Sequence, residues 1–156
     1  MRTGVLTLRT GAVLAGIAMF GWCTADTRTQ FMVQATVLPV ARFTRLISPI
    51  VLDVTSTDVA RGYVEVTQPT RVSVASNASG FVLDVHTIVP VLSGISVYGV
   101  SGSATLTGEG GSIVERNRVP GTADLELTFR LVLAPGTEAG RYAWPLQLAV
   151  RPLVGL

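Results

Sequence analysis

Alternating apolar and polar residues near the C-terminal end of the chain carry its clearest structural signal. Large apolar side chains occupy every second position of a first limb, residues 124–133, and of a second limb, residues 141–150. A period of two places such side chains on one face of a β-strand. The segment 134–140 between the limbs is rich in turn residues. The pattern predicts a long antiparallel hairpin whose apolar face another sheet must cover, because an isolated hairpin is only marginally stable in water.

The second limb is also where we expect a partner strand. Pro145 cannot donate to a ladder of hydrogen bonds, and such prolines belong at sheet edges or at local breaks in pairing. The limb therefore either closes the fold from within or borders a groove that another chain fills. Its aromatic residues are interpreted as core rather than as a platform for sugars, because aliphatic residues continue the same face. The residues of this candidate edge are Tyr142, Trp144, Leu146, Leu148 and Val150.

Shorter alternating stretches predict further strands along the chain. The turn cluster 76–80 predicts a second hairpin, with Asn77 and Gly80 taking unusual backbone angles. The apolar stretch 43–54 is interrupted at Ser48-Pro49, which indicates two short strands or one bent strand. No stretch has the periodicity of an amphipathic helix. The remaining strands are expected at 31–37, 62–67, 71–75, 81–85, 95–100, 103–107 and 113–116.

Turn signals recur about every 8 to 12 residues, which is typical of all-β folds. Of the 156 residues, 48% are hydrophobic and 14% charged, as in one globular domain. We therefore expect an all-β fold, an immunoglobulin-like antiparallel β-sandwich, with a small β-barrel as the alternative.

The N-terminal residues have the pattern of a signal peptide. Arg2 and Arg9 precede an apolar run over residues 11–22, and the small residues at 23–25 suit cleavage before Asp26. An uncleaved anchor is one alternative, but the run is shorter than the roughly 20 residues of a membrane span. A lipoprotein signal at Cys23 is the other, but the lipid-attachment signal needs a small residue where Trp22 stands. We expect residues 1–25 to be removed, leaving a single domain over 26–156 with no stable membrane span. The chain would be exported to the periplasm or the cell surface.

Removal of the leader changes the charge and the redox chemistry of the chain. Ten arginines then balance ten acidic residues, lysine is absent, and the arginines are scattered. Without a basic stripe, nucleic acid is not an expected partner. Cys23 is the only cysteine and leaves with the leader, so the exported domain would fold without disulfides.

Few residues are suited to catalysis. His86 is the only histidine, and Asp84 would share its strand face. No nucleophile motif accompanies them, since Ser101 lacks the final glycine of a G-x-S-x-G elbow. One histidine without a cysteine cannot assemble a zinc site, and the glycine-rich segment 108–112 lacks the ending of a phosphate loop. Paired carboxylates for glycoside hydrolysis have no favoured spacing among Glu109, Glu115, Asp124 and Glu126.

We therefore predict that the protein is not an enzyme and has no catalytic, cofactor or metal site. A hydrolase that uses Asp84 and His86 is kept as a third hypothesis. Asn77-Ala78-Ser79 matches the glycosylation sequon, but a turn at Asn77 explains the same residues.

Three features together resemble the pilin and spore-coat-U-type subunits of chaperone-usher systems. They are the alternating segment directly after the leader, Ser76-Asn77 followed by residues 80–83, and Gly140-Arg141-Tyr142 leading into an alternating strand. The chain departs from that family by lacking a cysteine near Pro39 and by continuing through residues 152–156.

The resemblance implies an incomplete immunoglobulin-like fold. Its groove would be filled by the N-terminal extension of the next subunit. Before that step a periplasmic chaperone would hold the subunit, and an outer-membrane usher would be a further partner in assembly. The extension would be residues 26–38, although these could equally form the first strand of their own domain. The residues that match the alternating donor segment are Phe31, Val33, Ala35 and Val37.

Two functions follow. The first is an exported structural subunit of a surface appendage or coat, which assembles with like subunits by β-strand addition. The alternative is a self-contained periplasmic or secreted β-sandwich that binds a protein or glycan partner through its loops. Oligomeric state separates the two.

Overall fold

The longest strand, β9 (Gly121–Leu133), connects most of the sheet. In the computed structural model, which describes residues 34–116 and 120–154, its first half pairs antiparallel with β4 (Thr70–Ser76). Its second half pairs with β6 (Leu92–Val100), and β3 (Tyr63–Glu65) pairs with residues 130–132. The alternation predicted for this strand is confirmed, because Leu127, Phe129 and Leu131 are buried.

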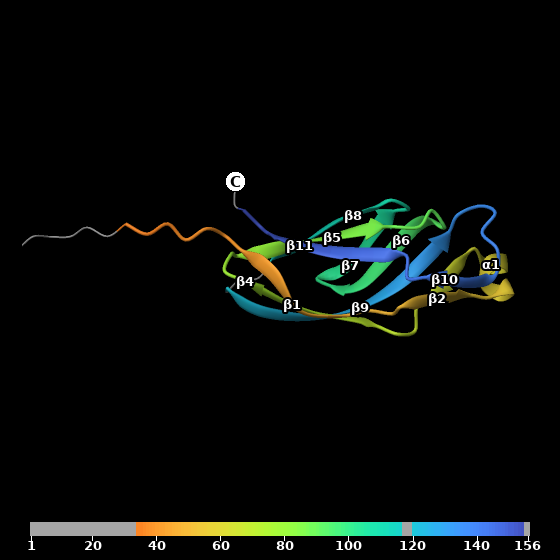
Figure 1. Ribbon diagram of the computed structural model, residues 1–156. Helices are drawn as coiled ribbons and strands as arrows, with labels where there is room; N and C mark the ends of the chain where they lie inside the picture. Colours follow the sequence, from red (N-terminus) through yellow and green to blue (C-terminus); the bar gives the residue numbers. More distant parts are fainter. Residues whose placement is uncertain (1–33, 117–119, 155–156) are drawn as a thin grey trace, which may run out of the picture. The chain divides into compact units, whose positions relative to one another are not determined.

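One antiparallel sheet runs through most of the described chain (Figure 1). Its strand order is β1 (Ala41–Ile47), β4, β9, β6, β7 (Gly102–Thr107), β8 (Gly110–Arg116), β5 (Gly80–Thr87) and β11 (Leu146–Pro152). Some Cα atoms of the two end strands lie within 8 Å of each other. The fold is therefore all-β, as predicted, and its sheet is barrel-like and nearly closed.

The core fills the inside of this sheet. Trp144 packs edge-on against Phe129, with ring centroids 6.0 Å apart. The strands supply β-branched, leucine and phenylalanine side chains from alternate positions, and their burial is the main stabilising term of such a fold. The most deeply buried apolar residues are Val74, Phe81, Leu83, Val85, Ile95, Val97, Leu127 and Leu131.

A second, two-stranded sheet joins β2 (Val51–Val54) to β10 (Gly140–Ala143). The helix α1 (Ser56–Arg61) follows β2 in a stretch for which the sequence shows no helical periodicity. The helix begins at a capping box between Thr55 and Asp58 and ends at Gly62, whose φ is +78°. Six residues are too few for a helical period to show in the sequence.

Both predicted hairpins are wrong, although their strands exist. The limb 124–133 lies in β9, whereas the second limb divides into β10 and β11 and pairs with β2 and β5 instead. The turn 76–80 connects β4 to β5, but β4 pairs with β1 and β9 while β5 pairs with β8 and β11. In each case the turn residues reverse the chain between strands that bind other partners.

Predictions of local structure are confirmed more often than predictions of strand pairing. The stretch 43–54 holds two strands, β1 and β2, and the second limb is interrupted at Trp144-Pro145. Gly80 does not have the unusual backbone angle predicted for it. It is required for space instead, because a Cβ there would lie 2.3 Å from the carbonyl oxygen of Glu115.

The chain divides into two units, Met1–Ala35 and Thr36–Leu156, and all strands described above belong to the second. The predicted signal peptide, Phe31 and Val33 lie outside the described residues. Residues 34–40 are exposed and belong to no strand, so the described part of the strand predicted at 31–37 is not a strand of this fold. No helix within the described ranges is long and apolar enough to cross a membrane.

Candidate strand-addition site

The two ends of the sheet order, β1 and β11, form a seam between two strand edges. β1 bonds to β4 on one side, and β11 bonds to β5 on one side. Within the described part of the chain, no backbone hydrogen bond joins β1 to β11. Unpaired edges of this kind are templates for another strand.

Apolar side chains border the seam on the core side. Leu46 of β1 lies opposite the buried Val72, and Leu148 of β11 lies opposite the buried Val85. Residues directly opposite in an antiparallel pair share a face, so both leucines are on the core face. Leu46 nevertheless has 43% of its surface exposed. The core is therefore incompletely covered along β1.

The seam is limited at both ends. At one end the β2–β10 pair closes it, extended by a 2.9 Å hydrogen bond from the Trp144 N–H to the Ile50 carbonyl. At the other end, Ala41 pairs with Ser76 and the Leu153 N–H binds the Gly80 carbonyl, so β1 and β11 both reach the 76–80 turn. The unpaired stretch lies between these two ends.

Asn77 holds the residues that precede β1. Its backbone N–H donates to the Val40 carbonyl at 3.1 Å. Its side-chain Oδ1 accepts from the Val40 N–H at 2.6 Å, and its Nδ2 donates to the Leu38 carbonyl at 2.9 Å. The segment before this attachment is uncovered: Val37 is 79% exposed and Leu38 72%. Apolar residues this exposed are candidates for burial against a partner.

The candidate edge residues of the second limb fall into two groups. Trp144 and Leu146 are buried in the core, which confirms the core interpretation for the tryptophan, and Tyr142 is half-buried in β10. Leu148 and Val150 are half-buried in β11 and pack against the core beside the seam. Of the donor candidates, Ala35 and Val37 are described, and both are exposed outside any strand.

Residues considered for catalysis have structural partners. Asp84 accepts from the Ser112 hydroxyl at 2.5 Å and from Arg151 Nε at 3.0 Å, while His86 is exposed. Glu115 is buried, and its carboxylate accepts from the Ser101 backbone N–H at 2.7 Å and from the Ser101 hydroxyl. These bonds fix the β6–β7 turn. No group of three metal-binding side chains occurs among the residues that the structure describes.

Of the other candidate carboxylates, Asp124 accepts from the Ser73 hydroxyl, and Glu126 lies 3.7 Å from Arg71 in an exposed ion pair. Glu109 is exposed in the β7–β8 turn. Asp124 and Glu126 line the same surface cavity beside Arg45 and Arg71, and each already has the neighbouring partner just named.

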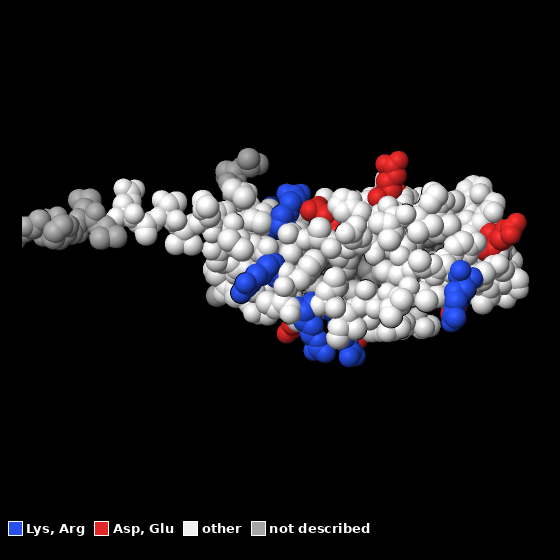
Figure 2. All heavy atoms as spheres, in the orientation of Figure 1, with Lys and Arg blue, Asp and Glu red and all other residues white. Residues whose placement is uncertain are grey.

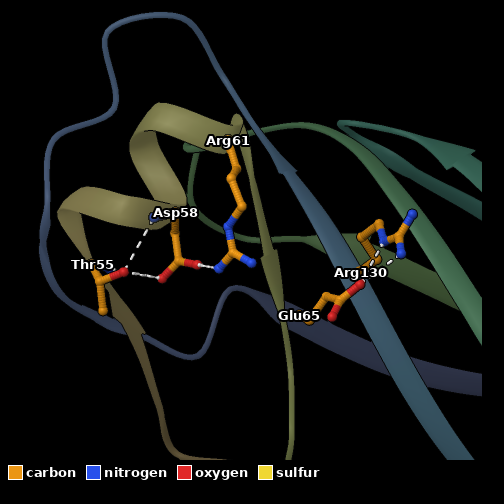
Figure 3. Close-up of polar contacts among 5 residues, drawn as sticks. All are labelled: Thr55, Asp58, Arg61, Glu65 and Arg130. Carbon is orange, nitrogen blue, oxygen red and sulfur yellow. Dashed lines mark hydrogen bonds and ion pairs between the residues drawn. The ribbon is translucent and has the colours of Figure 1, made fainter.

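Two ion pairs, Asp58–Arg61 and Glu65–Arg130, stabilise the end of the fold that carries α1 (Figure 3). Thr55 and Arg61 bind Asp58, and the hydrogen bonds from Thr55 lower the pKa of that carboxyl. Arg130 binds Glu65 at 2.6 Å, and the guanidinium carbons of Arg61 and Arg130 lie 5.4 and 4.9 Å from the centre of the Tyr63 ring. Each of these four charged side chains therefore has a partner of opposite charge within the fold.

Charged residues are scattered over the face shown in Figure 2, with no basic or acidic stripe on it. The surface over β11 is mostly uncharged. This distribution suits an edge that binds by backbone hydrogen bonds and apolar side chains rather than by charge.

Comparisons with protein-family models, with curated proteins and with solved structures each gave no match to this chain.

The sequence reasoning missed two residues of the site. Leu46 belongs to the stretch 43–54, whose pattern fits either two short strands or one bent strand and therefore does not assign a face to this residue. For Asn77 the sequence predicts a turn and matches a glycosylation sequon, and neither places it against Val40. Its distance of 37 residues from Val40 gives no sequence signal, because the contact depends on the β1–β4 pairing.

Proposed function

We propose that the protein is an exported structural subunit of a surface appendage or coat that assembles by β-strand addition and performs no catalysis. The observation that carries the proposal is the seam, in which two strand edges face each other without backbone bonds and Leu46 remains exposed on the core face. A strand bound there would satisfy main-chain donors and acceptors and cover the apolar side chains.

The exposed segment before β1 supports the same proposal from the donor side. Val37 and Leu38 are apolar and lie on the surface, and the alternation of the segment continues back to Phe31. A segment with this alternation can present its apolar side chains to the seam of another copy. The residues proposed as the donor are Phe31, Val33, Ala35 and Val37.

The proposal requires the seam to widen. Strands in a sheet lie about 4.8 Å apart, so inserting one between β1 and β11 needs edges about 10 Å apart. Some of their Cα atoms lie within 8 Å. The edges must therefore separate by a few Å where they are closest, and a chaperone that holds them apart would lower this barrier.

The architecture proposed with this function is an immunoglobulin-like sandwich opened along the seam. β9 supports it, because its first half pairs with β4 and its second half with β6. We also propose an exported location, with a periplasmic chaperone and an outer-membrane usher as assembly partners.

Oligomeric state tests the function. The chain with residues 26–38 is expected to form heat-labile, detergent-resistant multimers on an unboiled gel, and the chain without them is expected to be monomeric. A monomeric protein whose fold is unaffected by that deletion would instead support the alternative, a self-contained domain that binds a protein or glycan through its loops. The β2–β10 pair, which joins the two edges within one chain, favours this alternative.

A further inference from the structure

We propose that Asn77 is a positioning residue that prevents the N-terminal extension from pairing with the seam of its own chain. This inference rests on the proposed function and concerns its regulation: whether a subunit fills its own seam or that of a second copy. The observation behind it is the set of three hydrogen bonds from one residue to the backbone of Leu38 and Val40.

The bonds continue the β1–β4 ladder beyond the end of β1. Ala41 pairs with Ser76, and the next pair along is Val40 with Asn77, joined through the Asn77 N–H. The side-chain amide of Asn77 then takes the place of a further peptide group, since it accepts from one backbone N–H and donates to a carbonyl two residues earlier. Residues 38–40 are thereby held in line with β1.

Self-pairing would require the chain to reverse at these same residues. For residues 31–37 to lie along the free edge of β1 in their own chain, a turn has to form between Leu38 and Ala41. Pro39 would suit the second position of that turn, which bonds the Leu38 carbonyl to the Ala41 N–H. Asn77 Nδ2 already binds the Leu38 carbonyl, the acceptor that this turn needs, so it competes directly with the reversal, while its Oδ1 holds the Val40 N–H in line with β1.

The test compares the full chain with the variants Asn77→Ala and Ser79→Ala. Ser79→Ala is the matched control, because it removes the same sequon at an exposed position and leaves the amide of Asn77 in place. Asn77→Asp replaces the donor to Leu38 with a carboxylate oxygen and serves if the alanine variant does not fold. Amide hydrogen exchange is measured at a dilution where the protein is monomeric, and multimers are then counted on unboiled gels.

In Asn77→Ala we expect exchange at the Val40 amide to rise about 5- to 30-fold, the factor that corresponds to losing one or two net hydrogen bonds. We also expect amides 31–37 to become protected within the monomer and the multimer fraction to fall. Ser79→Ala should match the unaltered chain. Unprotected amides 31–37 in the Asn77→Ala monomer, with an unchanged multimer fraction, would overturn the inference.

The inference and the proposed function fail in different ways. If the unaltered chain forms no multimers at any concentration, the proposed function is wrong, and protection of amides 31–37 in the Asn77→Ala monomer still decides the role of Asn77. If the unaltered chain forms multimers and the variant behaves identically, only the inference is wrong.

Discussion

Trp144 packs edge-on against Phe129, with the two ring planes at 71° and their centroids 6.0 Å apart. Phe129 lies where β9 passes from β4 to β6, and Trp144 lies where the chain passes from β10 to β11. The contact therefore joins the place where β9 changes partners to the break between β10 and β11. Edge-to-face aromatic pairs of this kind stabilise beyond the area that they bury.

Replacing Trp144 by alanine is expected to lower the free energy of unfolding by about 3–5 kcal/mol, the usual cost of deleting a large buried aromatic side chain. Tyr142→Phe is the control. It removes only the hydroxyl that donates to the Glu138 carbonyl and should cost about 0.5–1.5 kcal/mol. Urea unfolding followed by circular dichroism measures both, and equal losses would contradict the central position of the Trp144–Phe129 contact.

The seam can be tested with two neighbouring residues of β1 that are about equally exposed. Leu46 has 43% and Ile47 41% of its surface exposed, but Leu46 is on the core face and Ile47, opposite Arg71, is on the outer face. We expect Leu46→Glu to abolish multimers and Ile47→Glu to leave them unchanged, because only the first places a charge inside an occupied seam.

Unfolding measurements on the two monomers provide the control for that comparison. Ile47→Glu is an exposed surface substitution worth about 0.5 kcal/mol or less. Leu46→Glu should also stay folded, because a side chain at this 43% exposed position can turn its charge to water in the monomer. If Ile47→Glu blocks assembly as strongly as Leu46→Glu, the seam is not the site of strand addition.

Asp58 gives the fold a defined response to acid. The hydrogen bonds from Thr55 lower the pKa of Asp58 below its usual value near 3.9. A carboxyl with a lowered folded-state pKa contributes stability that is present above the unfolded pKa and is lost as the pH falls through the folded pKa. Stability should therefore decline below about pH 4.

The variant Asp58→Asn isolates this contribution. At pH 7 it should be about 0.3–1 kcal/mol less stable than the unaltered chain, the usual value of a negative charge in the first turn of a helix. The difference should shrink as the pH falls toward 2, where Asp58 is itself protonated. A difference that stays constant from pH 7 to pH 2 would show that the charge of Asp58 does not matter.

The sequence predicts strands well here and their partners poorly. The alternation of Leu127, Phe129 and Leu131 is local information, and it correctly identifies both a strand and its buried face. Pairing depends on which edges meet after the whole core has assembled. The turn residues at 76–80 and 134–140 suit tight reversals, yet the strands that they connect bind other neighbours.

At the candidate site, too, the features that depend on local alternation could be predicted, and those that depend on strand pairing could not. The half-burial of Leu148 and Val150 beside an edge agrees with their alternation and with Pro145 as a break in pairing. The sequence does not identify Leu46, because its exposure results from the outer edge of β1, which pairs with no other strand among residues 34–116 and 120–154. The helix α1 has a single local signal in the sequence, the capping-box residues Thr55 and Asp58.

Binding of the separated donor to the separated acceptor tests strand addition most directly. The measurement titrates a labelled peptide of residues 26–38 into the chain that lacks those residues and follows anisotropy. We predict saturable 1:1 binding, which a peptide with serine at Phe31, Val33, Ala35 and Val37 does not reproduce and which Leu46→Glu abolishes in the acceptor. No binding of the native peptide to an acceptor that is folded by circular dichroism would contradict the account.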